Sequence, residues 1–155
     1  MHKFIAEQYL PISIEKAWEF FSSPGNLALI TPPEMEFKIL SHNLEKEIYE
    51  GMIIDYRVKP LLGIPVKWRT RIGKTMLHES FSDNQIEGPY SVWEHNHYFT
   101  SQNGGTMMRD VVNYDLPLGI IGNIMHSLVV RKKINYIFEF RKSILEKMFN
   151  KNDAH

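Results

Sequence analysis

The chain has 155 residues, the length of one ordinary domain, and its 43% hydrophobic and 23% charged residues are typical of a globular protein. Eighteen basic and eighteen acidic side chains cancel, which argues against recruitment of nucleic acid or an anionic membrane by a strong overall field. The absence of cysteine excludes disulfides, thiol catalysis and cysteine-bound metal centres.

The N-terminal residues are too polar for a signal peptide, and no apolar run is long enough to span a bilayer. We therefore expect no stable membrane insertion, and a reducing cytoplasm is the expected location. Without a repeat or a linker-like stretch, the sequence predicts one domain over residues 1–150 and a short polar tail over 151–155.

The N-terminal part predicts a strand followed by two short helices. Lys3–Leu10 is an extended run that Pro11 ends. Ser13 is a good N-cap for a helix through Phe21, and a second short helix is expected over residues 24–30.

The middle of the chain is rich in predicted strands, over residues 36–42, 51–59 and 66–75. In the last of these runs, Trp68 and Thr70 would share one face, whereas Lys67 and Arg69 would lie on the other. This alternation is typical of an antiparallel sheet with one face in solvent. Residues 81–87 fit either a strand or a hairpin turn at Asp83-Asn84.

The most informative stretch follows the turn Gly88-Pro89. Trp93, His95, His97 and Phe99 recur at every second residue, so a strand would place all four on one face. Two imidazoles between aromatic rings suggest the wall of an apolar pocket with a polar group.

A hairpin signal at Asn103-Gly104 joins this stretch to residues 106–116. A two-residue loop there pairs His97 with Asp110 and Trp93 with Tyr114. A slip of one residue would move these side chains to opposite faces, so the match supports the register.

Residues 124–150 show a broad apolar stripe at helical spacing. The basic runs at residues 131–133 and at Arg141-Lys142 are interpreted as a solvated helix face rather than a nucleic-acid surface. The fold class is therefore α+β, with a curved antiparallel sheet folded over one long C-terminal helix.

These elements and motifs resemble the helix-grip superfamily, also called SRPBCC, which includes START-type lipid-transfer domains, birch-pollen-allergen-like proteins and polyketide cyclase/dehydrase proteins. The resemblance covers Phe4–Phe21, the pattern of Phe81, Asp83, Gln85 and Gly88-Pro89-Tyr90 continuing to Phe99, and the segment from Gly104 through Asp110 to Pro117. Within the superfamily, the second pattern resembles a bacterial ligand-binding subgroup.

The resemblance implies a cavity between the concave sheet face and the C-terminal helix, and a strand over residues 81–87 with Asp83 and Gln85 on the side of Phe81. For Asp83 and Gln85 we favour hydrogen bonding to the Gly88-Pro89 turn over contact with a ligand. The side chains expected to line or close the cavity are Tyr56, Trp68, Thr70, Trp93, His95, His97, Asp110, Val112, Tyr114, Ile124 and Leu128.

For His95 and His97 several interpretations remain open. They could be structural and tied to Asp110, they could bind a ligand, or they could act in catalysis. With Asp110 they also form the donor set of a non-heme iron site, but we expect no metal and no cofactor, because the distance across a strand pair equally suits a histidine–aspartate hydrogen bond.

The leading functional hypothesis is a binding protein for a small hydrophobic molecule, such as a lipid, an isoprenoid or a polyketide-like ring. The alternatives are a cyclase, dehydratase or isomerase that uses His97 as general base oriented by Asp110, and an interaction module with a vestigial cavity. The sequence defines neither the ligand nor the oligomeric state.

Overall fold

The computed structural model describes residues 1–42, 47–60, 63–117 and 123–150, with residues 123–127 described by their backbone alone. The predicted tail over 151–155 lies outside these residues. The elements are β1 (His2–Leu10), α1 (Ile14–Phe21), the 3₁₀ helices η1 (Pro24–Ile30) and η2 (Pro33–Met35), β2 (Lys38–Ile39), β3 (Ile53–Val58), β4 (Val66–Met76), β5 (Ser80–Glu87), β6 (Val92–Gln102), β7 (Gly105–Asp115) and α2 (Asn123–Asn150).

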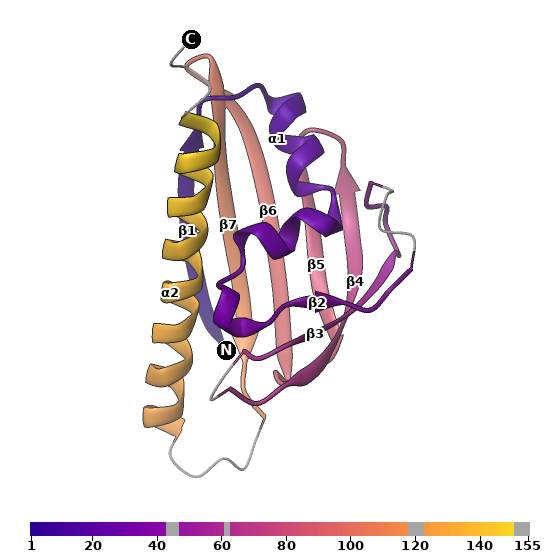
Figure 1. Cartoon of the computed structure of the whole chain (residues 1–155), viewed down its shortest axis with the longest axis vertical. Coiled ribbons are helices and arrows are strands. Elements are labelled where there is room, and N and C mark those ends of the chain that lie inside the picture. The colour runs from indigo at the N-terminus through magenta and orange to yellow at the C-terminus, as the bar shows by residue number, and fades with distance from the viewer. Residues whose placement is uncertain (43–46, 61–62, 118–122, 151–155) are drawn as a thin grey trace.

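The described strands form one antiparallel sheet of seven strands in the order β1-β7-β6-β5-β4-β3-β2. The helices α1 and α2, together with η1, lie on one face of this curved sheet (Figure 1). The expected α+β architecture, a sheet folded over a long C-terminal helix, is confirmed.

Local sequence accounts for the N-terminal elements. The Ser13 hydroxyl accepts a hydrogen bond from the Lys16 amide and caps α1, as expected. The second short helix is present but has 3₁₀ geometry. The strand expected over residues 36–42 is wrong in length, since only Lys38–Ile39 pairs with β3.

Residues 81–87 belong to the strand β5, which pairs with β4 and with β6. The hairpin between β6 and β7 has the predicted register, in which His97 faces Asp110 and Trp93 faces Tyr114. At the turn, Asn103 and Gly104 have φ of 49° and 77°, the left-handed values that a tight two-residue hairpin loop requires.

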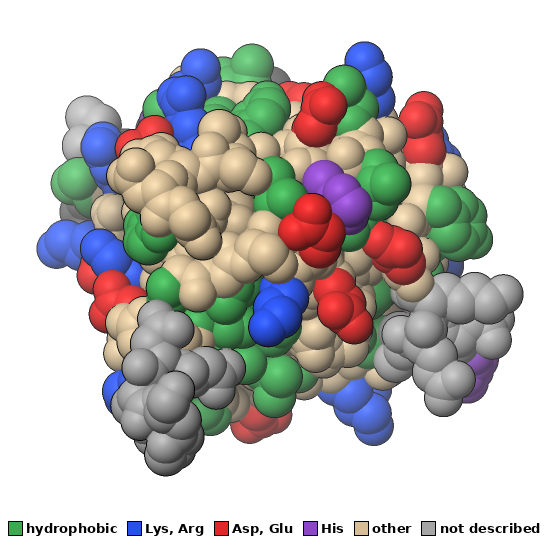
Figure 2. Space-filling view, turned by 90° about the horizontal axis from the view of Figure 1, so that it is seen from above, with side chains coloured by type: hydrophobic (Ala, Val, Ile, Leu, Met, Phe, Trp, Pro, Cys, Tyr) green, Lys and Arg blue, Asp and Glu red, His purple; other side chains and the backbone are tan. Residues whose placement is uncertain are grey.

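Two apolar clusters hold the helices on the sheet. Under α1 and the C-terminal end of α2, Trp18, Phe99 and Leu145 belong to one cluster. Towards the N-terminal half of α2, Val112 and Ile134 belong to the other. Figure 2 shows the end of the molecule that is uppermost in Figure 1, where acidic, basic and hydrophobic side chains are interspersed. None of the described helices is long and apolar enough to cross a membrane.

Candidate functional site

A cavity lies between the sheet and the helices and encloses about 1290 Å³ of space, including its opening to solvent. Its walls come from β3, β4, β5 and β6 on the sheet side and from α1, η1 and α2 on the helix side. Aromatic and aliphatic side chains make up most of the lining, and the polar side chains on the wall include Asp83, His95, His97 and Arg141.

The structure brings six of the predicted site residues to the cavity wall: Tyr56, Trp68, Thr70, Trp93, His95 and His97. The Tyr56 and Thr70 hydroxyls lie 3.3 Å apart in a hydrogen bond, and the rings of Tyr56 and Trp68 are stacked. Burial raises the pKa of Tyr56, so its hydroxyl remains protonated and can donate a hydrogen bond.

The remaining predicted residues lie elsewhere. Asp110 lines a second hollow between β1 and α2 rather than the main cavity, because its carboxylate lies behind His95 and His97. Val112 and Tyr114 are fully buried beside the cavity rather than on its wall, because Val130 and Ile134 of α2 pack in the same cluster. Leu128 is 54% exposed, so the expectation that it closes the cavity is wrong: this turn of α2 presents it to solvent. The side chain of Ile124 lies outside the described residues.

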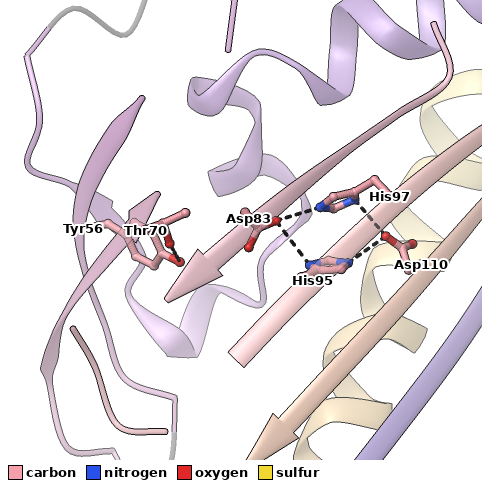
Figure 3. Close-up of polar contacts among 6 residues, drawn as sticks. All are labelled: Tyr56, Thr70, Asp83, His95, His97 and Asp110. Carbon is pink, nitrogen blue, oxygen red and sulfur yellow. Dashed lines mark hydrogen bonds and ion pairs between the residues drawn. The ribbon is translucent and has the colours of Figure 1, made fainter. Parts of the chain in front are cut away.

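His95 and His97 are held between two carboxylates, as Figure 3 shows. His95 Nε2–H donates to Asp110 Oδ1 over 2.8 Å, and His97 Nε2–H donates to Asp83 Oδ2 over 2.7 Å. The two rings overlap, with centroids 3.8 Å apart. The predicted cluster of His95, His97 and Asp110 is therefore present, and Asp83 completes it from β5.

The second nitrogen of each ring also faces a carboxylate, but less favourably. His97 Nδ1 lies 2.9 Å from Asp110 Oδ1, an ion-pair distance, yet it has no well-aligned hydrogen-bond partner. His95 Nδ1 lies 3.5 Å from Asp83 Oδ2. Each imidazole thus bridges the same two carboxylates with one well-directed bond and one weaker contact.

The two imidazoles differ in their protonation. Burial opposes the charged form of His97, but the hydrogen bonds and charges of Asp110 and Asp83 outweigh it and raise its pKa above 6.5. Burial, together with the charge of His97, lowers the pKa of His95, which Asp83 and Asp110 only partly offset. Of the two imidazoles, His97 is therefore the one whose surroundings favour the protonated form, whereas those of His95 favour the neutral form.

Both carboxylates remain ionised in this environment. Burial alone would raise the pKa of Asp110, but its contacts with His95 and His97 hold that pKa far below its usual range. The same opposition lowers the pKa of Asp83, where its contacts with His95 and His97 outweigh burial.

Asp83, His95 and His97 have one donor atom each within 4.8 Å of one another, so these three could hold a metal ion. The carboxylate and imidazoles of this cluster also satisfy each other by direct contact. The geometry thus accommodates either a shared proton or a cation between Asp83 and the ring nitrogens.

Sequence reasoning missed two members of the site. Asp83 was expected to bond to the Gly88-Pro89 turn, but it turns into the cavity instead, while Gln85 alone takes the expected role through hydrogen bonds with the backbone of Tyr90. Arg141 was expected on a solvated face, and this is wrong, since the side chain is only 8% exposed. The alternation along β5 could have indicated Asp83, whereas the rotation of α2 is set by packing.

Comparison with solved structures shows the fold of this chain in other proteins. The protein TTHA0849 from Thermus thermophilus has a TM-score of 0.68 and 19% identity, over 99% of this chain and 100% of that one. A START superfamily protein from Mycobacterium smegmatis gives 0.69 and 12%, over 96% and 99%. Ara h 8.0201, a Bet v 1-like allergen, gives 0.59 and 14%, over 94% and 98%.

These similarities extend over nearly the whole chain at low sequence identity, and they show that the fold is the START-like helix-grip fold expected from the sequence motifs. No protein-family model and no curated protein sequence matches the chain.

Proposed function

We propose that the protein binds one small, largely apolar molecule, such as a lipid, an isoprenoid or a polyketide-like ring, in the cavity between the sheet and α2. The observation that carries this proposal is the composition of the cavity wall, where aromatic and aliphatic side chains surround a compact buried group of ionisable ones. A molecule with an apolar body and one or two oxygen functions is complementary to such a wall. The cytoplasm is the compartment that we propose for this binding.

The direct test is mass spectrometry of the purified protein under native conditions, followed by extraction into organic solvent. We expect a small apolar molecule that travels with the folded protein and is released on unfolding. N-phenyl-1-naphthylamine, a neutral fluorophore that brightens in apolar surroundings, provides an independent binding assay. A folded protein that carries no such molecule and does not bind the fluorophore would favour the interaction module with a vestigial cavity.

A second candidate function, an isomerase, dehydratase or cyclase, is favoured by the state of His95. A general base must be unprotonated, and the neutral imidazole of His95, oriented through its bond from Nε2–H to Asp110, meets that requirement better than His97. His95 therefore replaces His97 as the proposed base, and Asp110 remains the orienting group.

The extracted molecule itself tests this second candidate. It would be incubated with parent protein and with the His95→Gln variant, and the mixture would be analysed for isomers or dehydrated products by liquid chromatography and mass spectrometry. Product formed by the parent alone supports catalysis. Recovery of the unchanged molecule from both would leave binding as the function.

A further inference from the structure

Arg141 is a buried cation on the helix side of the cavity. It is 8% exposed, it lines the main cavity, and its guanidinium carbon lies 4.8 Å from the centre of the Phe138 ring. A second, smaller cavity between α2 and β1 is also lined by Arg141. The side chain therefore lies between two hollow regions rather than in bulk solvent.

The guanidinium group has no hydrogen bond or ion pair with any residue that the structure describes, and its Nε is buried without a partner. Buried charged groups in proteins are almost always paired, because desolvation without a compensating contact is costly. Burial lowers the pKa of Arg141, and the charges of Asp110 and Asp83 offset that effect only in part.

The neighbouring carboxylates do not meet this need, because they are already engaged. Asp83 accepts from His97, and Asp110 accepts from His95. Both are close enough to influence Arg141 electrostatically, but neither forms an ion pair with it. The donors of Arg141 thus remain available on the cavity wall, next to the only ionisable cluster that the described part of that wall contains.

We infer that the ligand is an apolar acid whose carboxylate is bound by Arg141, with its hydrocarbon part against the aromatic wall of the cavity. This inference rests on the proposed binding function and specifies its ligand class. A guanidinium group offers parallel N–H donors that match the two oxygens of a carboxylate, and such charge-assisted bonds are about twice as strong as neutral ones.

The charges of the cluster are compatible with an incoming anion. Asp83 and Asp110 contribute two negative charges and Arg141 one positive charge, while the raised pKa of His97 favours a second positive charge and the lowered pKa of His95 favours its neutral form. A bound carboxylate adds one negative charge next to a neutral imidazole. Proton uptake by His95 would restore neutrality, because a nearby anion favours the imidazolium form.

The test compares decanoic acid, decan-1-ol and methyl decanoate as competitors that displace N-phenyl-1-naphthylamine from the parent protein. These probes share a ten-carbon chain and differ in the head group. A charge-assisted hydrogen bond worth about 1.5–3 kcal/mol predicts that the acid displaces the fluorophore at a concentration at least about tenfold lower than the alcohol or the ester.

Arg141→Met keeps the length and apolar stem of the side chain and removes the charge. In this variant, the acid, the alcohol and the ester should displace the fluorophore at about the same concentration. Arg141→Lys should retain part of the preference for the acid, because an ammonium group keeps the charge but loses the planar fork. Lys142→Met is the matched control, since the exposed Lys142 is adjacent in sequence and also loses one positive charge. It should keep the full preference.

Far-ultraviolet circular dichroism and thermal melts confirm that each variant is folded before its affinities are compared. Equal displacement by acid, alcohol and ester in the parent protein would overturn the inference while leaving the binding function intact. A preference that survives in folded Arg141→Met would also overturn it. Failure of the fluorophore and all three competitors to bind would instead overturn the proposed function.

Discussion

The imidazole of His97 shows how a buried group can retain its charge. Asp110 and Asp83 favour its protonated form more than burial opposes it, so its pKa in the folded protein lies above the ordinary value of 6.5. A raised pKa means that the folded state binds the proton more tightly than the unfolded state. The resulting stabilisation is complete below about pH 6.5 and disappears as the pH rises through the folded pKa.

The His97→Gln variant should therefore lose more stability at pH 6 than at pH 9. Glutamine can accept and donate hydrogen bonds but does not titrate, so the difference in free energy of unfolding from the parent should shrink as the pH rises. Urea unfolding at several pH values measures this, with each unit of pKa shift worth about 1.4 kcal/mol.

Two comparisons make the result specific to His97. The experiment is repeated in a His95→Gln background, because removal of the charge on His97 relieves one of the effects that lower the pKa of His95. His42→Gln, at an exposed position, serves as the matched control. Parallel stability profiles for parent and His97→Gln across this pH range would contradict the raised pKa.

At the scale of elements, the hairpin between β6 and β7 sets the geometry of the site. Its two-residue turn fixes the register, and the register places His95 and His97 beside Asp110. This part of the site could be predicted, because alternation along both strands and the Asn103-Gly104 signal are local in sequence. The same information could not place Arg141, since the side of α2 that faces the cavity depends on packing against β1 and η1.

Gly104→Ala should destabilise the protein through the backbone of this turn. The position has φ of 77°, and an added Cβ would meet no atom within 4 Å, so conformational strain rather than a clash is the expected cause. A left-handed non-glycine residue costs roughly 1–2 kcal/mol. Gly25→Ala, also in open space but without a positive φ, is the control for urea unfolding. Equal midpoints for the two variants would exclude the strain.

The two elements that carry Trp93 and Trp18 should respond differently to truncation. Trp93 on β6 lines the cavity, whereas Trp18 on α1 is 3% exposed and packs on Phe81 and Phe99 in the core. Trp93→Ala should weaken binding of N-phenyl-1-naphthylamine more than Trp18→Ala does. Trp18→Ala should cost more stability, about 3–5 kcal/mol. Affinities are compared at equal folded fraction, and equal losses would contradict this division of roles.

For the whole molecule, an occupied cavity should raise the stability of the fold. A ligand that binds only the native state at 100 times its dissociation constant adds about 2.7 kcal/mol to the free energy of unfolding. Protein stripped of apolar molecules by unfolding and extraction, then refolded, should melt at a lower temperature than the protein as purified. Adding back the extract should restore the difference. Identical melting curves for stripped and untreated protein, both fully refolded, would argue against a bound molecule.

The architecture of the molecule followed from its sequence more fully than its site did. Strand alternation, the Ser13 cap and the apolar stripe after residue 123 each report a local preference, and these preferences together define the helix-grip arrangement. The site draws on β5, β6, β7 and α2 at once. The position of Asp83 against the histidines depends on the pairing of β5 with β6. These two strands are not connected by a short turn signal of the kind at Asn103-Gly104, so their register could not be predicted in the same way.

The position of β1 in the sheet has a consequence for the protein during its synthesis. Among the described strands, β1 pairs only with β7, and all the other strands of the sheet lie between these two along the chain. Each of the other sheet contacts joins strands that follow one another in sequence. Because the ribosome adds about 5–20 residues per second, β7 is synthesised roughly 5–20 s after β1. During that time the backbone donors and acceptors of β1 are open to other chains. On a polysome, the β7 strand of an adjacent nascent copy has the matching sequence, so this topology allows β1 to be exchanged between copies.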